Sequence, residues 1–153
     1  MIEFGPMTYT DIPEVINLGL QLHKESVHSK WEYDEAFTMD LVGKVLLDAE
    51  HKTFHSDLAK EDGKIIGMLF GLQFSPAFVK AKVAADIMLY VIPEKRNGTL
   101  ALKLIRTFEK WARYHKLSGI QLGTTTGIKS ERTSKFYNRL GYDYSNYILT
   151  KDL

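Results

Sequence analysis

The sequence contains no cysteine among its 153 residues. Disulfides, thiolate metal sites and a cysteine nucleophile are therefore excluded. Long apolar runs are missing too, and no segment approaches the roughly 20 residues of a membrane-spanning helix. The opening stretch, MIEFGPMTYTDIPEV, lacks the basic start and apolar core of a signal peptide. From these absences we expect a soluble cytoplasmic protein that has no membrane partner.

Neither sign of charge is in excess, because 20 lysine and arginine residues are balanced by 19 aspartate and glutamate residues. A nucleic-acid-binding domain normally shows a basic excess, so no nucleic-acid partner is expected. The histidines have no cysteine or carboxylate neighbours at ligand spacing, so no metal site is expected either. The length and a hydrophobic fraction of 44% suit one globular domain over residues 1–153.

Hydrophobic periodicity and turn signals divide the chain into predicted elements. Apolar residues recur every three or four positions after Gly98, which predicts the clearest helix of the sequence. The predicted strands are 2–4, 53–61, 64–73, 83–92, 119–124 and 142–150, and the predicted helices are 10–26, 35–49, 98–115 and 130–140. This order, β-α-α-β-β-β-α-β-α-β, predicts an α/β (α+β) domain with a mixed central sheet and helices on both faces.

The stretch EKRNGTLALKLI (94–105) joins a predicted buried strand to that amphipathic helix. It matches neither G-x-x-x-x-G-K-[ST] nor G-x-G-x-x-G, so the two common nucleotide-binding loops are excluded. The first amides of a helix are nevertheless unpaired donors that favour an anion, and Arg96 would add a forked cation. A plain helix N-cap by Asn97 is the alternative.

The arrangement Val91-x-Pro93-x-x-Arg96-x-x-Thr99-x-Ala101 resembles the acetyl-CoA-binding motif of the GNAT superfamily of N-acetyltransferases, V-x-P-x-x-(R/Q)-G-x-G-x-(G/A). Asn97 and Thr99 replace the two leading glycines of that motif. Asparagine is the best substitute for glycine where a positive φ is required. Thr99 would narrow the approach to the pyrophosphate, although its hydroxyl could donate a hydrogen bond to it.

A second stretch, SERTSKFYNRLGYDY (130–144), resembles the C-terminal signature of the same superfamily. Tyr137 falls on the family's tyrosine, and Gly141-Tyr142 falls on its glycine–aromatic pair. The order of predicted elements is similar to the family fold over nearly the whole chain. The RNG loop and the helix FEKWARYHK are most similar to bacterial and bacteriophage members.

The resemblance implies that acetyl-CoA is the co-substrate. It implies that strand 83–92 bulges and separates from strand 119–124, opening a slot for the pantetheine arm. A backbone amide near Leu89 would polarise the thioester carbonyl. Implied contacts to acetyl-CoA lie at Leu89, Val91, Arg96, Asn97, Gly98, Thr99, Leu100, Ala101 and Ser130.

The implied reaction is direct attack of a primary amine on the thioester, without a covalent acyl-enzyme. Tyr137 is the candidate general acid for the leaving thiolate, and a half-buried packing tyrosine is the alternative reading. The general base is open among four residues. They are Asp86 at the start of the central strand, and Glu25, His28 and Glu32 in the helical region. The segment HSKWEYDE (28–35) is expected to line the pocket of a small-molecule or peptide amine.

Two other functions fit the same residues. With both motif glycines replaced, the chain could be a catalytically degenerate acyl-CoA-binding or regulatory module of the same fold. A pure interaction domain would instead show an exposed apolar patch and no pantetheine slot. Many superfamily members pair through sheet edges, so the resemblance is also compatible with a homodimer.

Overall fold

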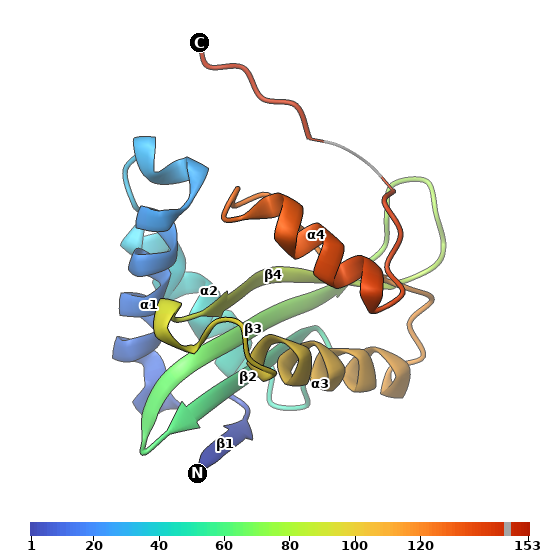
Figure 1. The fold of residues 1–153 in the computed structure, drawn as a ribbon. Coiled ribbons are helices and arrows are strands. Elements are labelled where there is room, and N and C mark those ends of the chain that lie inside the picture. The colour runs from blue at the N-terminus through green and yellow to red at the C-terminus, as the bar shows by residue number, and fades with distance from the viewer. Residues whose placement is uncertain (146–147) are drawn as a thin grey trace.

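A computed structural model describes residues 1–145 and 148–153, and in that part the chain forms one five-stranded sheet of order β1-β2-β3-β4-β5 and four α-helices. This arrangement confirms the predicted mixed α/β architecture (Figure 1). Among the described residues, no helix is long and apolar enough to cross a membrane. The strands are β1 (Ile2–Gly5), β2 (Phe54–Glu61), β3 (Lys64–Phe74), β4 (Val83–Val91) and β5 (Ile120–Gln121), and the helices are α1 (Ile12–Glu25), α2 (Glu35–Leu47), α3 (Leu100–Tyr114) and α4 (Ser130–Arg139).

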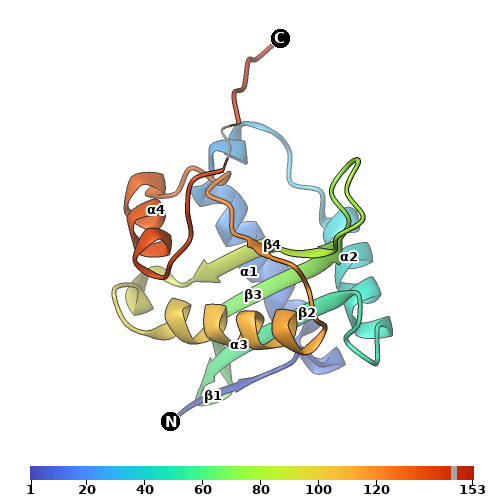
Figure 2. The ribbon, with the colours of Figure 1, turned by 90° about the vertical axis from the view of Figure 1, so that its right-hand side faces the viewer.

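Helices cover both faces of the sheet, as the nearly continuous apolar sequence of β3 requires. Helices α1 and α2 pack on one face, while α3 packs on the other and α4 lies beside it (Figure 2). The core between α3 and the sheet is called here the second core, and the apolar stripe of α3 supplies half of its buried residues, because residues three and four apart share one side of a helix. The buried apolar members of the stripe are Leu100, Leu104, Ile105, Phe108, Trp111 and Ala112.

Strand β4 contains a bulge at its centre. Phe70 of β3 pairs with Met88, but the next residue of β3, Gly71, pairs with Asp86, so Ile87 is an extra residue. Side chains alternate between the faces of a strand, and one extra residue shifts that alternation. Asp86 therefore shares the α3 side of the sheet with Leu89 and with the residues of the second core.

Strand β5 is shorter than predicted. Its parallel pairing with β4 is limited to Ala84–Ile120 and Ala85–Gln121, whereas the sequence predicts a strand over 119–124. The next pairing position is taken by a side chain, because the Asp86 carboxylate accepts the hydrogen bond of the Gly123 amide. The bulge and this carboxylate together end the ladder.

The last predicted strand, 142–150, is not formed by residues 142–145 or 148–150, and positions 146 and 147 lie outside the described residues. The tyrosines and apolar residues of this stretch suit a strand locally. A strand also requires a neighbour with free backbone groups, however, and β5 offers only two residues. Residues 148–153 instead extend away from the sheet (Figures 1 and 2).

Candidate active site

The candidate site begins where β4 and β5 separate. Their pairing stops at Ala85 and Gln121, and the Asp86 Oδ1 atom accepts a hydrogen bond of 2.9 Å from the Gly123 amide just beyond that point. Further along β4, residues 86–91 have no ladder partner on the β5 side within the described chain. The bulge and the end of strand pairing that the family resemblance implied are both present. We call the unpaired interval between residues 86–91 of β4 and the chain after Gln121 the slot.

The loop after β4 presents free amides at the start of α3. Asn97 has φ of 75°, which an asparagine tolerates better than most residues, and Thr99 occupies the N-cap position without a side-chain capping bond. The first amide there to reach a backbone carbonyl is that of Lys103, which donates to Thr99 (3.0 Å). In the part of the chain that the structure describes, the amides of residues 97–102 have no acceptor. Such a row of donors at a helix N-terminus fits a pyrophosphate.

Arg96 is paired with groups outside this row of amides. Its Nε atom donates to the Val91 carbonyl at 2.8 Å, and both terminal nitrogens contact the Glu25 carboxylate, at 2.8 and 3.0 Å. The guanidinium also lies over the Tyr90 ring, 5.3 Å from its centre. The sequence predicted that Arg96 binds phosphate, and this stays a prediction; in the structure Arg96 lies in a network that joins β4 to the end of α1.

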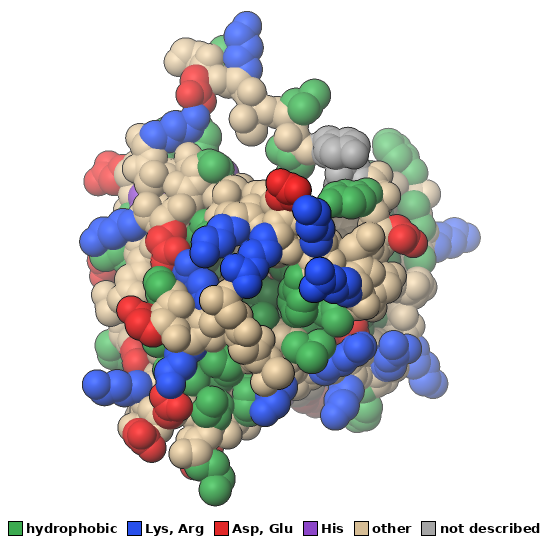
Figure 3. Space-filling model, viewed as in Figure 1, with side chains coloured by type: hydrophobic (Ala, Val, Ile, Leu, Met, Phe, Trp, Pro, Cys, Tyr) green, Lys and Arg blue, Asp and Glu red, His purple; other side chains and the backbone are tan. Residues whose placement is uncertain are grey.

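A different arginine reaches the loop. Arg132 of α4 donates to the Asn97 side-chain oxygen, across 35 positions of sequence. It lies in a shallow, open cleft over the first turns of α4 that is also lined by Lys129, Ser130, Glu131 and Lys135. Figure 3 shows lysine and arginine side chains gathered around this part of the surface. The cleft brings Ser130, an expected cofactor contact, beside cations that the sequence analysis did not single out.

Asp86 and Tyr137 have pKa values that depart from the ordinary range. Burial raises the pKa of Asp86 to about 6, although the hydrogen bond from Gly123 opposes the shift. Burial also raises the pKa of Tyr137, and the charge of Asp86 adds to that effect. The two groups are therefore electrostatically coupled. Among the described residues, nothing forms a hydrogen bond with the Tyr137 hydroxyl, so it is available to another partner.

The other candidate bases are placed less favourably. Arg96 lowers the pKa of Glu25, and the hydrogen bond from Tyr90 lowers it further, which makes this carboxylate a weak base. His28 stacks on Trp31, with ring centres 5.6 Å apart, and Glu32 is exposed. A partly buried carboxylate with a raised pKa is better suited to accept a proton near neutral pH, and Asp86 alone of the four has that property.

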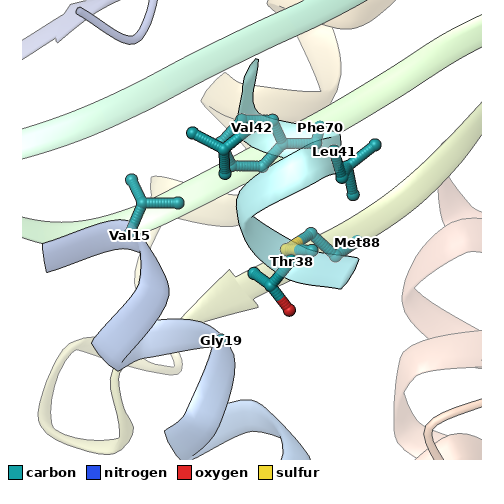
Figure 4. Close-up of a pocket in the computed structure, with 7 residues that line it drawn as sticks. All are labelled: Val15, Gly19, Thr38, Leu41, Val42, Phe70 and Met88. Atoms are coloured by element: carbon teal, nitrogen blue, oxygen red, sulfur yellow. The ribbon is translucent and has the colours of Figure 1, made fainter. Parts of the chain in front are cut away.

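The segment 28–35 was expected to line the acceptor pocket. One of its members, Tyr33, packs on Gly19 of α1 and donates to the Ile16 carbonyl at 3.3 Å, so its role is at least partly structural. Close by, a small apolar cavity of about 10 Å³ lies between α1, α2 and the sheet (Figure 4). That volume is about the space of one water molecule, which is too small for an amine substrate. The residues that line it are Val15, Gly19, Thr38, Leu41, Val42, Phe70 and Met88.

The glycine–aromatic pair of the C-terminal signature follows α4 and connects it to α3 through a hydrogen bond. Gly141 has φ of 94°, and the following Tyr142 donates a hydrogen bond of 3.0 Å to the buried Glu109 of α3. Tyr142 and Tyr137 thus have different environments although both belong to the same signature.

Comparison with known proteins agrees with this geometry. The family model described as "Acetyltransferase (GNAT) family" matches residues 18–142. The chain belongs to the GNAT acetyltransferase family. No similar sequence was found among curated proteins.

Solved structures of GNAT proteins share the fold at low sequence identity. One is AAC(6')-Iy in complex with the bisubstrate analog CoA-S-monomethyl-acetylneamine, with a TM-score of 0.75, 18% identity, and coverage of 100% of this chain and 98% of that one. The aminoglycoside 6'-N-acetyltransferase AAC(6')-IG of Acinetobacter haemolyticus matches with a TM-score of 0.72, 18% identity and coverage of 99% and 97%. A predicted acetyltransferase of Clostridium acetobutylicum, solved with acetyl-CoA, matches with a TM-score of 0.75, 14% identity and coverage of 99% and 96%.

Sequence reasoning missed two features of this site, the turn of Arg96 toward Glu25 and the reach of Arg132 to Asn97. Both join residues far apart in the chain, and neither pair has a spacing that reveals it. The only signal in the sequence was a basic residue in the first turn of α4.

Proposed function

We propose that this GNAT protein transfers the acetyl group of acetyl-CoA to a primary amine. The observation that carries the proposal is the separation of β4 and β5 directly beside the free amides of residues 97–102. The slot suits the narrow pantetheine arm, and the amides suit the pyrophosphate. The cations of the α4 cleft, Lys129, Arg132 and Lys135, would attract the phosphates of the nucleotide end.

In the proposed reaction the amine nitrogen forms a bond to the thioester carbon, and the carbon–sulfur bond breaks. Asp86 accepts the proton that the amine loses, directly or through water, and a pKa of about 6 leaves it ionised at neutral pH. Tyr137 directs its free hydroxyl to the sulfur. Because its pKa is raised, it keeps its proton at neutral pH and stabilises the thiolate mainly as a hydrogen-bond donor. The backbone near Leu89 would polarise the carbonyl.

Binding and turnover test the proposal separately. Binding of acetyl-CoA is measured by calorimetry and by the shift in thermal unfolding that a ligand of the native state produces. Turnover is measured as release of free thiol over a panel of amines. The panel includes aminoglycosides, because two structural neighbours are aminoglycoside acetyltransferases, together with polyamines, amino acids and peptides. Absence of acetyl-CoA binding would refute the proposal.

The second candidate is a GNAT module that binds acyl-CoA without acetyl transfer. Thr99 favours it, because a side chain stands where the family motif has its second glycine. This candidate predicts acetyl-CoA binding with no thiol release over the whole panel. A pure interaction domain, which predicts an exposed apolar patch and no pantetheine slot, would show neither acetyl-CoA binding nor thiol release.

The segment 28–35, which is expected to line the acceptor pocket, carries the exposed acids Glu32 and Glu35. A cationic amine would be attracted to them, so they support an amine acceptor as a class. A cytoplasmic location and a homodimer stay predictions. Sedimentation of the full chain in the presence and absence of acetyl-CoA tests the second of these.

A further inference from the structure

The junction between α1 and the 3₁₀ turn η2 (Val27–Lys30) contacts both sides of the slot. On the β4 side, the Glu25 carboxylate accepts a hydrogen bond from the Tyr90 hydroxyl and binds both terminal nitrogens of Arg96. On the other side, two residues later, the Val27 amide donates to the Thr126 carbonyl at 2.8 Å. Residues 25–27 therefore bridge two segments that the sheet itself does not connect beyond Ala85 and Gln121.

The contact on the second side is tightly packed. Gly127 has φ of 72°, and a Cβ atom placed there would lie 2.2 Å from the Val27 Cγ1 atom. No side chain fits at position 127 while Val27 keeps its place. At this point the chain after β5 approaches Val27 as closely as a glycine allows.

On the β4 side, the contact is an ion pair between Glu25 and Arg96. Arg96 uses one N–H on the Val91 carbonyl and the two arms of its fork on Glu25, and its side chain is only 21% exposed. Paired, charge-assisted hydrogen bonds of this kind are stronger and more directional than a single one. The same side chain fixes the turn from β4 into residues 97–102, because it closes the loop back onto the strand that precedes it.

We propose that residues 25–27 form a strap across the slot, and that Arg96 is a positioning residue that anchors this strap through Glu25 and does not bind phosphate directly. The strap sets the separation of the two slot walls and the direction of the loop amides at the same time. This inference rests on the proposed binding of acetyl-CoA. It goes beyond that function by assigning Glu25 and Arg96 to the geometry of the slot.

Glu25→Gln distinguishes direct phosphate binding by Arg96 from the strap, because the two hypotheses predict opposite changes in the affinity for acetyl-CoA. If Arg96 bound the phosphates directly, removal of the negative charge that competes for it would tighten the binding of an anion. The strap predicts weaker binding, because a glutamine amide places N–H donors against the donors of Arg96. We expect the dissociation constant of acetyl-CoA, measured by calorimetry, to rise about tenfold. Unchanged or tighter binding would overturn the inference.

Arg96→Lys keeps the positive charge and loses the fork. We expect a loss of acetyl-CoA affinity similar to that of Glu25→Gln, and no further loss when the two substitutions are combined, because each removes the same link. The matched control is Glu61→Gln, which removes the ion pair of Lys95 in the same loop at similar exposure but belongs to β2 and not to the junction after α1. Its affinity should stay within twofold of the wild type. An equal loss in the control would show that any loop anchor matters and would refute the strap.

Hydrogen exchange of the free protein gives a readout that does not depend on acetyl-CoA. The amides of Val27, Ser29 and Trp31 are all hydrogen-bonded in the folded chain, and we expect them to exchange faster in Glu25→Gln but not in Glu61→Gln. Unaltered exchange would contradict the strap even if acetyl-CoA binds. If the wild-type protein does not bind acetyl-CoA, the proposed function fails, and the exchange of residues 26–31 still decides whether the strap exists.

Discussion

The Asp86 side chain accepts a hydrogen bond of 2.9 Å from the Gly123 amide, at the position where the pairing of β4 with β5 stops. One carboxylate thus ends the parallel ladder, and it lies at the inner end of the slot that results. Because burial raises its pKa to about 6, the same group is suited to accept a proton.

Asp86→Asn should lower turnover about 100-fold, because the amide has the shape to accept the Gly123 bond but cannot accept a proton from the amine. In the wild type, activity should fall as the pH decreases through about 6, where Asp86 becomes protonated. This acid limb should be absent from the variant. The measurement is turnover against pH at saturating acetyl-CoA.

Asp57→Asn is the matched control for that profile. Burial raises the pKa of Asp57 to about 6 as well, but this residue lies on β2 beneath α3, where its carboxyl contacts Thr107. We expect the variant to keep both its turnover and the acid limb of the profile. Loss of the limb in Asp57→Asn would remove Asp86 as its source.

Asp57→Asn should also stabilise the fold at neutral pH. A folded-state pKa near 6, above the ordinary 3.8, means that ionisation of Asp57 costs stability as the pH rises from about 4 to above 6. Burial lowers the pKa of His55 to about 4. The unfolded chain therefore binds more protons at His55 than the folded chain does up to about pH 6.5, so this residue makes stability rise with pH and partly masks the loss from Asp57 in the wild type. Urea unfolding should show a gain of about 1–2 kcal/mol at pH 7 and little change at pH 4. Equal stability of the two proteins at pH 7 would contradict the assigned cost.

Tyr137→Phe should reduce turnover about 10- to 100-fold and leave the affinity for acetyl-CoA within twofold. Its stability should be unchanged, because no group among the described residues depends on the Tyr137 hydroxyl. Tyr142→Phe provides the opposite pattern, since that hydroxyl binds the buried Glu109. Its loss should cost about 1–2 kcal/mol of stability with turnover preserved. Full activity of Tyr137→Phe would exclude it from the reaction.

Asn97 offers a test of the amide cradle. Glycine suits its φ of 75°, so Asn97→Gly should keep acetyl-CoA binding within about threefold, the remaining effect coming from the lost contact with Arg132. Asn97→Val should weaken binding at least tenfold, because a β-branched residue is strained at that φ and would turn the following amides. Calorimetry of both variants measures the difference. Equal affinity of the two would show that the loop amides do not hold the phosphates.

The fold could largely be predicted because its signals are local. The stripe of α3, the turn EDGK and the apolar run of β3 each lie within a dozen residues, and the structure confirms all three elements close to their predicted bounds. The exception is the stretch 142–150, whose composition suits a strand. Strand formation depends on a partner elsewhere in the chain, and the short β5 offers none over this length.

The sequence by itself determined the family motifs, the element order up to α4 and the positive φ at Asn97, because each depends on residue type and spacing along a short stretch. Only the tertiary structure decided where the long side chains point. Residue type alone allows Arg96 to bind either a phosphate at the loop or the Glu25 carboxylate, and the approach of α1 to β4 places it on Glu25. The width of the slot is likewise a property of contacts between distant segments, since Val27 and Gly127 are 100 positions apart and meet only when the chain has folded.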